Sequence, residues 1–266
     1  GHSSGSRRWC ILHRWVNRQA GFFGHEGGPA FVGQCDRFGT FHRGSTHLDR
    51  FRNPDEMPAR EITLTSDLYI GETEVTTGLF SEFLLATGYD MGEAGQILIT
   101  CDDNLPAHNV SWRDAQAFIQ WLNSRTREAV YRLTTETEWE YACRAGSRSM
   151  YFFGDRFGEL DRFAWYWKNA DRQPQPVATR EPNPWGLYDV YGNVYEWTSD
   201  WYRSDSYRAG ETVDPVGPET GPNRELRGGG WACNPDNCRS AYRNHAPPDK
   251  RAPAIGFRLV MEPVLR

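Results

Sequence analysis

The sequence predicts an α+β fold with few helices, short antiparallel strands and much irregular structure. Three observations predict it. Convincing helical patterns are confined to residues 76–146, the apolar stretches outside them are only strand-length, and 26 Gly and 16 Pro among 266 residues favour turns. Because 11 Trp, 12 Tyr and 14 Phe can fill a core, the chain is expected to fold despite a mean hydropathy of -0.71.

Three helices are expected, each marked by a capping residue ahead of apolar residues that share one helical face. Thr76 or Thr77 caps the first helix, which ends at Gly88, and Ser111 caps the second. Thr135 opens a third, short helix that stops near residue 146. Strands are expected at the short apolar stretches, which are residues 62–64, 68–70, 194–197 and 256–260.

The chain is expected to hold one domain with a short appendage. Residues 1–6 are typical of a cloning remnant, and residues 7–57 are expected to form an irregular segment packed on the domain. The domain itself is assigned to residues 58–266, a length that suits one core. No signal peptide or anchor is evident, and a native N-terminus could have been removed with such a remnant, so the sequence assigns no compartment.

Charge and composition argue against two classes of partner. The net charge is -5 at a pI of about 5.8, and no run of Lys and Arg stands out, so no nucleic-acid partner is expected. No apolar run approaches the ~20 residues of a membrane span. The cysteines lack zinc-site spacing and are expected to be mostly free buried thiols; they are Cys10, Cys35, Cys101, Cys143, Cys233 and Cys238.

Five motifs in the right order resemble the formylglycine-generating (sulfatase-modifying) family, and they span roughly residues 55–260. Two are short, Tyr-Ile-Gly-Glu-Thr-Glu-Val-Thr at 69–76 and Pro-Ala-His-Asn-Val-Ser-Trp at 106–112. The next is Tyr-Arg-Leu-Thr-Thr-Glu-Thr-Glu-Trp-Glu-Tyr-Ala at 131–142, where Thr134 replaces the family's usual Pro. The others are Asn-Pro-Trp-Gly-Leu-Tyr-Asp-Val-Tyr-Gly-Asn-Val-Tyr-Glu-Trp at 183–197, and Leu-Arg-Gly-Gly-Gly-Trp at 226–231 through to Ile-Gly-Phe-Arg at 255–258.

The resemblance implies a C-type-lectin-like core, but it does not settle the function, because members of the family differ in what they do. Some are copper-dependent oxidases that convert a sulfatase cysteine to formylglycine. Others are sulfoxide synthases with an added iron domain. Still others are binding proteins, among them the variable proteins of diversity-generating retroelements, which use the C-terminal segment as a mutable binding surface.

The C-terminal segment looks like a diversified surface set in a fixed frame. The frame, defined as residues 228–231, 238–243 and 255–258, is as the family has it, whereas Ala, Cys, His, Pro and Lys stand between its parts where the family commonly has Asn. Retroelement diversification replaces adenines and so turns Asn codons into codons for almost any residue, although Lys250 requires a different template codon. We therefore predict a non-enzymatic ligand-binding protein whose partner is a protein or cell-surface ligand. The predicted contact positions are Trp231, Ala232, Cys233, Asn234, Asn237, Tyr242, Asn244, His245, Ala246, Pro247, Lys250, Ala252, Pro253 and Ala254.

Two other interpretations of this segment stay open. Ordinary drift in loops would leave similar residues without any diversification. A copper-dependent formylglycine-generating oxidase is the second, because Cys233 and Cys238 are spaced as in the oxidases, and two thiolates can hold Cu(I). Counted back from Pro248, however, the stretch is about three residues shorter than the resemblance to the oxidases requires. We therefore expect no catalytic cofactor, and we interpret Cys238 as a frame residue and Cys233 as a substituted position.

Asp189, Gly192, Val194 and Glu196 match family positions that bind a structural Ca²⁺. The resemblance implies side-chain oxygens from Asp189 and Glu196 and backbone carbonyls from Gly192 and Val194, a donor set that suits calcium. The alternative is a turn whose carboxylates face water or an arginine. A second family site, between residues 163 and 182, is not expected because that stretch is short.

Overall fold

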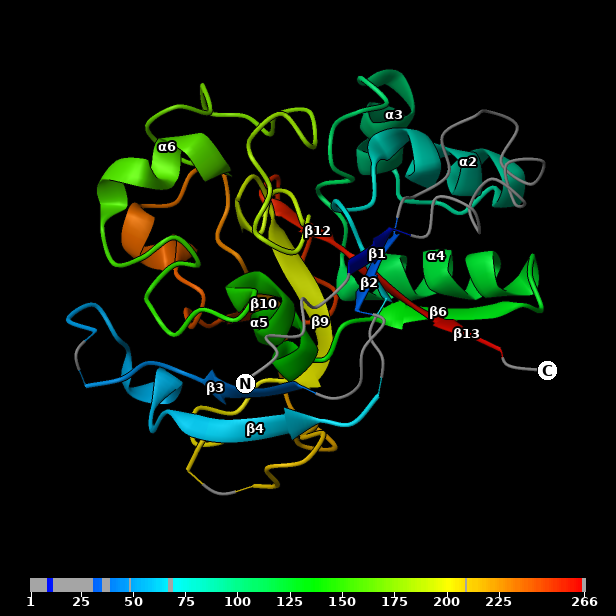
Figure 1. Ribbon diagram of the computed structural model, residues 1–266. Coiled ribbons are helices and arrows are strands. Elements are labelled where there is room, and N and C mark those ends of the chain that lie inside the picture. The colour runs from blue at the N-terminus through cyan, green and yellow to red at the C-terminus, as the bar shows by residue number, and fades with distance from the viewer. Residues whose placement is uncertain are drawn as a thin grey trace.

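The computed structural model describes residues 9–11, 31–34, 39–47, 49–66, 69–208 and 210–264. Its architecture is α+β, as expected (Figure 1). The strand β9 runs through the middle of the molecule, α2, α3 and α4 lie on one side, and α5 and α6 lie on the other. Among the described residues, no helix combines the length and apolar character needed to cross a membrane.

The three expected helices are confirmed, together with the caps that define them. The helix α2 (Thr77–Thr87) begins after Thr76, whose side chain accepts a hydrogen bond from the Leu79 N–H, and ends at Gly88 with a left-handed φ of 66°. The helices α4 (Trp112–Ser124) and α5 (Glu136–Arg144) each begin with a complete capping box. These caps satisfy N–H groups that would otherwise lack partners in the first turn.

Several shorter helical elements were not expected from the sequence. The helix α3 (Glu93–Thr100) follows Gly92, which offers no side-chain cap, and α6 (Leu160–Phe163) is a single turn without a cap. Their starts therefore lack the polar residue that marked the other helices. Three 3-10 turns complete the set, η1 (Pro54–Glu56), η2 (Phe157–Glu159) and η3 (Pro235–Cys238).

The strands form two larger sheets and two short ladders. The five-stranded sheet has the order β1 (Trp9–Ile11), β2 (Phe31–Gln34), β5 (Tyr69–Gly71), β13 (Leu259–Pro263) and β6 (Ala129–Leu133). The four-stranded sheet has the order β11 (Asn244–Ala246), β10 (Arg224–Arg227), β9 (Tyr195–Trp201) and β12 (Ile255–Phe257). The ladders are β3 (Gly39–Arg43) with β4 (Arg60–Leu64), and β7 (Ala164–Trp165) with β8 (Tyr191–Gly192). The pairings β12–β9 and β7–β8 are parallel, unlike the antiparallel pairs expected.

Two apolar cores lie on either side of the C-terminal segment. The first is built by α2, α4 and the four-stranded sheet, and its aromatic centre includes Phe118, which lies 5.4 Å from the ring of Phe80 and 5.6 Å from that of Phe257. The second lies between α5, the β3–β4 ladder and the following loops, around Trp139. Cys233 packs against both cores, which places the C-terminal segment at their junction.

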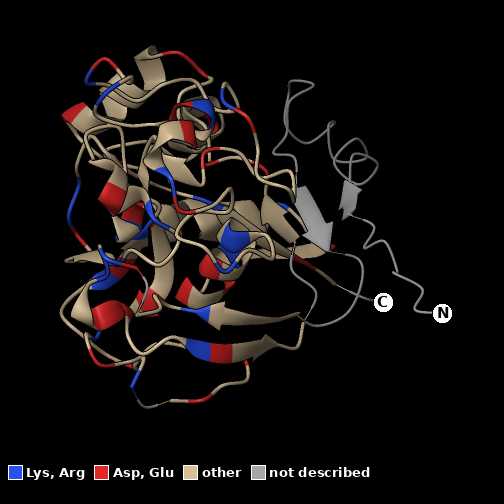
Figure 2. Cartoon of the chain, turned by 60° about the vertical axis from the view of Figure 1, so that its left-hand side comes forward, with Lys and Arg blue, Asp and Glu red and all other residues tan. Residues whose placement is uncertain are grey.

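Four buried arginines attach the C-terminal part of the chain to other elements. Arg227 pairs with Glu140 of α5 at 2.5 Å, and Arg258 pairs with Glu196 of β9 at 2.8 Å. The two remaining pairs are Arg239 with Glu56 and Arg243 with Glu225, each at 2.7 Å. Basic and acidic residues accordingly lie interspersed in Figure 2. Pairing is what makes such buried charges tolerable, since an isolated one would be strongly unfavourable.

Candidate functional site

A glycine turn opens the C-terminal segment and requires its glycines. Gly228 and Gly229 have φ angles of 93° and 80°, a region that disfavours any residue with a Cβ. A Cβ on Gly229 would lie 2.7 Å from Cys238 Sγ, so close packing excludes a side chain as well. The turn thereby brings the start of the segment against its own 3-10 turn η3.

The frame of the segment is mostly buried. Cys238, Arg239, Ser240, Ala241 and Arg243 are each at most 4% exposed. Ser240 N–H donates to the carbonyl of Met150, and the Arg227 guanidinium donates to the carbonyl of Tyr242. The residues from 255 to 258 are buried as well, in and after β12. Each part of the frame is therefore fixed by contacts to the body of the domain.

None of the predicted contact positions is buried. The exposed ones are Ala232, Asn234, His245, Pro247, Lys250 and Pro253. The half-buried ones are Trp231, Cys233, Asn237, Tyr242, Asn244, Ala246, Ala252 and Ala254. The contact positions thus meet the exposure that a binding surface requires. The frame residues do not, apart from Trp231 and Tyr242, which belong to both sets.

The contact positions fall into two neighbouring groups. One lies near Tyr195, whose hydroxyl accepts a hydrogen bond from Cys233 Sγ at 3.1 Å, and includes Trp231, whose Nε1 donates to the Pro253 carbonyl at 3.1 Å. The other lies at β11, where the His245 ring stacks on Tyr202 with 3.9 Å between ring centres. The two groups are joined by half-buried residues that pack on the same core, namely Cys233, Tyr242, Ala246 and Ala252.

Two aromatic residues outside the segment extend this surface and were missed from the sequence. Trp167 is 57% exposed, and its backbone N–H donates to the Cys233 carbonyl at 3.2 Å. Tyr202 supplies the ring beneath His245 and donates its hydroxyl to Asp55 at 2.9 Å. Neither lies in a motif of the C-terminal segment, so only the tertiary fold brings them to it.

The two thiols of the segment differ in access. Cys238 is fully buried, and Cys233 is half-buried. Burial raises the pKa of both thiols, and for Cys238 the neighbouring Cys233 raises it further. Both therefore favour the protonated thiol over the thiolate that binds metals. Two other described cysteines, Cys101 and Cys143, are also free thiols.

The residues predicted to bind calcium lie together at a buried turn. Asp189 is 2% exposed, and its Oδ2 accepts the Ala178 N–H at 2.8 Å. Its Oδ1 has no hydrogen-bond partner within the described residues. Gly192 and Val194 are buried in the turn and strand that follow. Burial raises the pKa of Asp189 to about 6, with the Glu196 carboxylate contributing in the same direction.

Glu196 is less well suited than Asp189 to bind a cation, because its carboxylate oxygens already have partners. Both of its carboxylate oxygens accept hydrogen bonds from Arg258, and Oε2 also accepts the Trp139 indole N–H at 2.8 Å.

Glu74 lies beside Asp189 and Glu196 and is 1% exposed. Neither of its carboxylate oxygens has a hydrogen-bond partner among the described residues. Its pKa is raised well above the usual range by burial first and by Asp189 second. Asp189 thus has an oxygen free for calcium, whereas Glu196 would have to share its oxygens with Arg258. Within the described parts of the chain, no three His, Cys, Asp or Glu residues form a ready metal site.

The chain is similar to known proteins of one family. The family described as "Sulfatase-modifying factor enzyme 1-like domain" matches residues 34–263. A formylglycine-generating enzyme of Streptomyces coelicolor is 37% identical over 175 residues, which are 60% of this chain and 54% of that enzyme, so the chain spans about half the length of this relative. A formylglycine-generating enzyme of Thermomonospora curvata is 30% identical over 287 residues, covering 85% of this chain and 92% of that enzyme.

Solved structures extend the comparison to proteins of other names. PvdO from Pseudomonas aeruginosa superimposes with a TM-score of 0.78 at 30% identity, covering 88% of this chain and 94% of PvdO. Variable protein 1 of Treponema denticola superimposes with a TM-score of 0.71 at 26% identity, covering 88% of this chain and 96% of that protein. The family match over most of the chain and the shared fold lead to one conclusion: the chain belongs to the sulfatase-modifying factor enzyme 1-like family.

Proposed function

We propose that this protein binds a protein or cell-surface ligand through the contact positions of its C-terminal segment, as the variable protein of a diversity-generating retroelement. The observation that carries the proposal is the division of the segment into two sets. The contact positions are exposed or half-buried, while the frame residues 238–241, 243 and 255–258 are buried, and ion pairs hold Arg239 and Arg243. Exposed positions on a fixed scaffold can change without unfolding it.

The shape and chemistry of the surface support protein recognition. The side chains of Ala232, Ala252 and Ala254 are small and project little from the surface. The aromatic rings of Trp167 and Trp231 provide anchors of the kind that dominate the binding energy of protein interfaces. The similarity to the variable protein of Treponema denticola is consistent with such a role.

The proposal can be tested by examining the gene and its neighbourhood for the signs of diversification. A near-copy of the segment should lie beside a reverse-transcriptase gene, with adenines at the codons of the contact positions. Deep sequencing of a population grown from one cell should then show substitutions confined to codons 231–254. Variation spread evenly along codons 58–266, or the absence of any near-copy, would contradict the proposal and leave a binding protein without diversification.

Copper-dependent oxidation of a sulfatase cysteine is the second candidate. It is favoured by the relatives named formylglycine-generating enzyme and by the spacing of Cys233 and Cys238 in the sequence. The test is Cu(I) titration of the purified protein, followed by incubation of a cysteine-containing sulfatase peptide with oxygen. Tight Cu(I) binding that is lost in Cys233→Ala, together with conversion of the peptide cysteine to formylglycine, would establish the oxidase. We expect neither.

A further inference from the structure

A cleft of about 470 Å³ lies apart from the contact positions, on the other side of the frame. One wall is formed by residues 44–46, 49 and 50, and the other by the loop from residue 144 to residue 155. Ala241 of the frame also lines it, although no contact position does. The volume falls within the roughly 300–1,000 Å³ of small-molecule sites.

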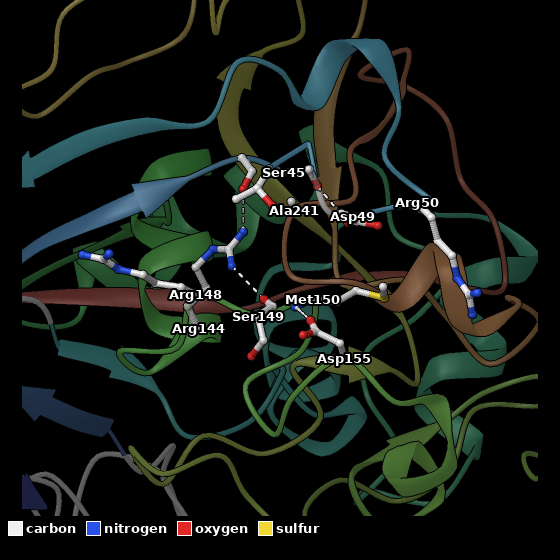
Figure 3. Close-up of a pocket in the computed structure, with 11 residues that line it drawn as sticks. Ser45, Asp49, Arg50, Arg144, Arg148, Ser149, Met150, Asp155 and Ala241 are labelled. Carbon is white, nitrogen blue, oxygen red and sulfur yellow. Dashed lines mark hydrogen bonds between the residues drawn. The ribbon is translucent and has the colours of Figure 1, made fainter.

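A buried guanidinium lies between the two walls. Arg144 is 3% exposed, and its Nη2 donates to the Gly44 carbonyl at 2.9 Å while its Nη1 donates to the Ser149 carbonyl at 3.0 Å. Its Nε donates to Glu140 Oε1 at 2.8 Å. Because each terminal nitrogen carries two hydrogens, one N–H on each remains unassigned at the centre of the cleft. Figure 3 shows this guanidinium between the two walls.

Two further guanidinium groups flank the cleft. Arg50 and Arg148 are exposed, and neither forms an ion pair with any described residue. In Figure 3 their guanidinium groups point outward at opposite ends of the cleft, with Arg144 between them. Arg144 is compensated by Glu140 at 2.8 Å, so the uncompensated positive charge of the cleft comes from Arg50 and Arg148. Guanidinium groups suit carboxylate and phosphate oxygens in particular.

The acidic residues of the cleft offset only part of this charge. Asp49 is already paired with Arg239 at 2.8 Å, so its charge is compensated. Asp155 is exposed, and its Oδ1 accepts the Met150 N–H at 2.7 Å, which holds the second wall in place. Asp155 therefore opposes anion binding weakly, while Arg50 and Arg148 both favour it.

We propose that this cleft binds a small molecule carrying two or more carboxylate or phosphate groups. Arg50 and Arg148 contact the ends of the ligand, Arg144 contacts its middle, and Met150 and Ala241 provide apolar surface beside it. Two anionic groups are required because the exposed guanidinium groups lie at opposite ends. The site is separate from the contact positions and does not depend on the function proposed for them.

The probes are citrate and inorganic pyrophosphate, each titrated into the whole protein at constant ionic strength. Binding is measured by calorimetry and by the NMR shifts of arginine Nε–Hε groups. We expect the double variant Arg50→Gln with Arg148→Gln to bind about tenfold more weakly, the loss of roughly one charge-assisted hydrogen bond. Preference for citrate or for pyrophosphate identifies the anionic group that the site selects.

Two further variants make the result specific. Asp155→Asn retains the acceptor for the Met150 N–H and removes the opposing charge, so it should bind about two- to threefold more tightly. Arg127→Gln, an exposed arginine on the α4–β6 connection, should leave binding unchanged. Equal binding by the wild type and the double variant, or equal weakening by Arg127→Gln, would overturn the proposal. All four positions are exposed, so the fold is expected to survive each change.

Discussion

Arg239 attaches the C-terminal segment to residues that precede it by almost two hundred positions. Its Nη1 and Nη2 donate to both carboxylate oxygens of Glu56 at 2.7 Å, and Nη1 also donates to Asp49 Oδ2 at 2.8 Å. Both Arg239 and Glu56 are at most 1% exposed. Such a pair contributes modestly when intact, but removing one partner leaves a buried charge without compensation.

We therefore expect Arg239→Gln to lower the free energy of unfolding by about 3–5 kcal/mol. Urea denaturation of the two proteins measures the difference. The matched control is Arg113→Gln, which breaks the exposed pair with Asp249 and should cost less than about 1 kcal/mol. Similar costs for the two variants would show that the Arg239 pair does not hold the segment.

Calcium at Asp189 is a second prediction at this scale. Calcium should raise the thermal midpoint of the wild type by a few degrees and chelator should lower it, because an ion bound only to the folded state stabilises that state. Asp189→Asn should abolish the response, whereas Glu181→Gln, at an exposed carboxylate, should retain it. A midpoint that is the same with calcium and with chelator in the wild type would rule out the site.

Among the elements, α4 depends most clearly on its cap. Ser111 Oγ accepts the Asp114 N–H at 3.1 Å, and Asp114 Oδ2 accepts the Ser111 N–H at 2.8 Å. We expect Ser111→Ala to destabilise the protein by about 1 kcal/mol in chemical denaturation. Gln120→Ala, at an exposed position of the same helix, is the control and should change stability by less than about 0.5 kcal/mol.

The elements that could be predicted are those specified by local chemistry. The caps at Thr76, Ser111 and Thr135 are contacts between a side chain and the backbone within one helical turn, so they can be predicted from the sequence. The strand β3 and the helix α3 were not predicted, because β3 depends on pairing with β4 and α3 has no side-chain cap. Contacts between distant segments, such as Trp167 with Cys233, depend on the tertiary fold and leave no local signal.

Across the whole molecule, the division between frame and contact positions predicts an unusual tolerance of change. A variant with Asn at Ala232, His245, Pro247, Lys250 and Pro253 together should keep its free energy of unfolding within about 2.5 kcal/mol of the wild type, because each of the five exposed changes contributes at most about 0.5 kcal/mol. Circular dichroism and denaturation measure this.

The comparison variant changes the frame instead. Arg239→Gln with Arg243→Gln removes two buried charges that compensate Glu56 and Glu225, and it should prevent stable folding. If the five exposed changes unfolded the protein as the frame changes do, the contact positions would be structural rather than interchangeable, and the proposed function would lose its basis.

The ion pairs of the frame also determine when the domain can finish folding during its synthesis. Glu56 and Glu196 leave the ribosome well before Arg239 and Arg258, the frame arginines that compensate them. Since chains emerge N-terminus first, a nascent chain that ends before residue 239 would bury these two carboxylates without their arginines. The domain therefore completes its fold only when its last segment arrives. Any variant that damages the frame is exposed to cellular proteases at that step.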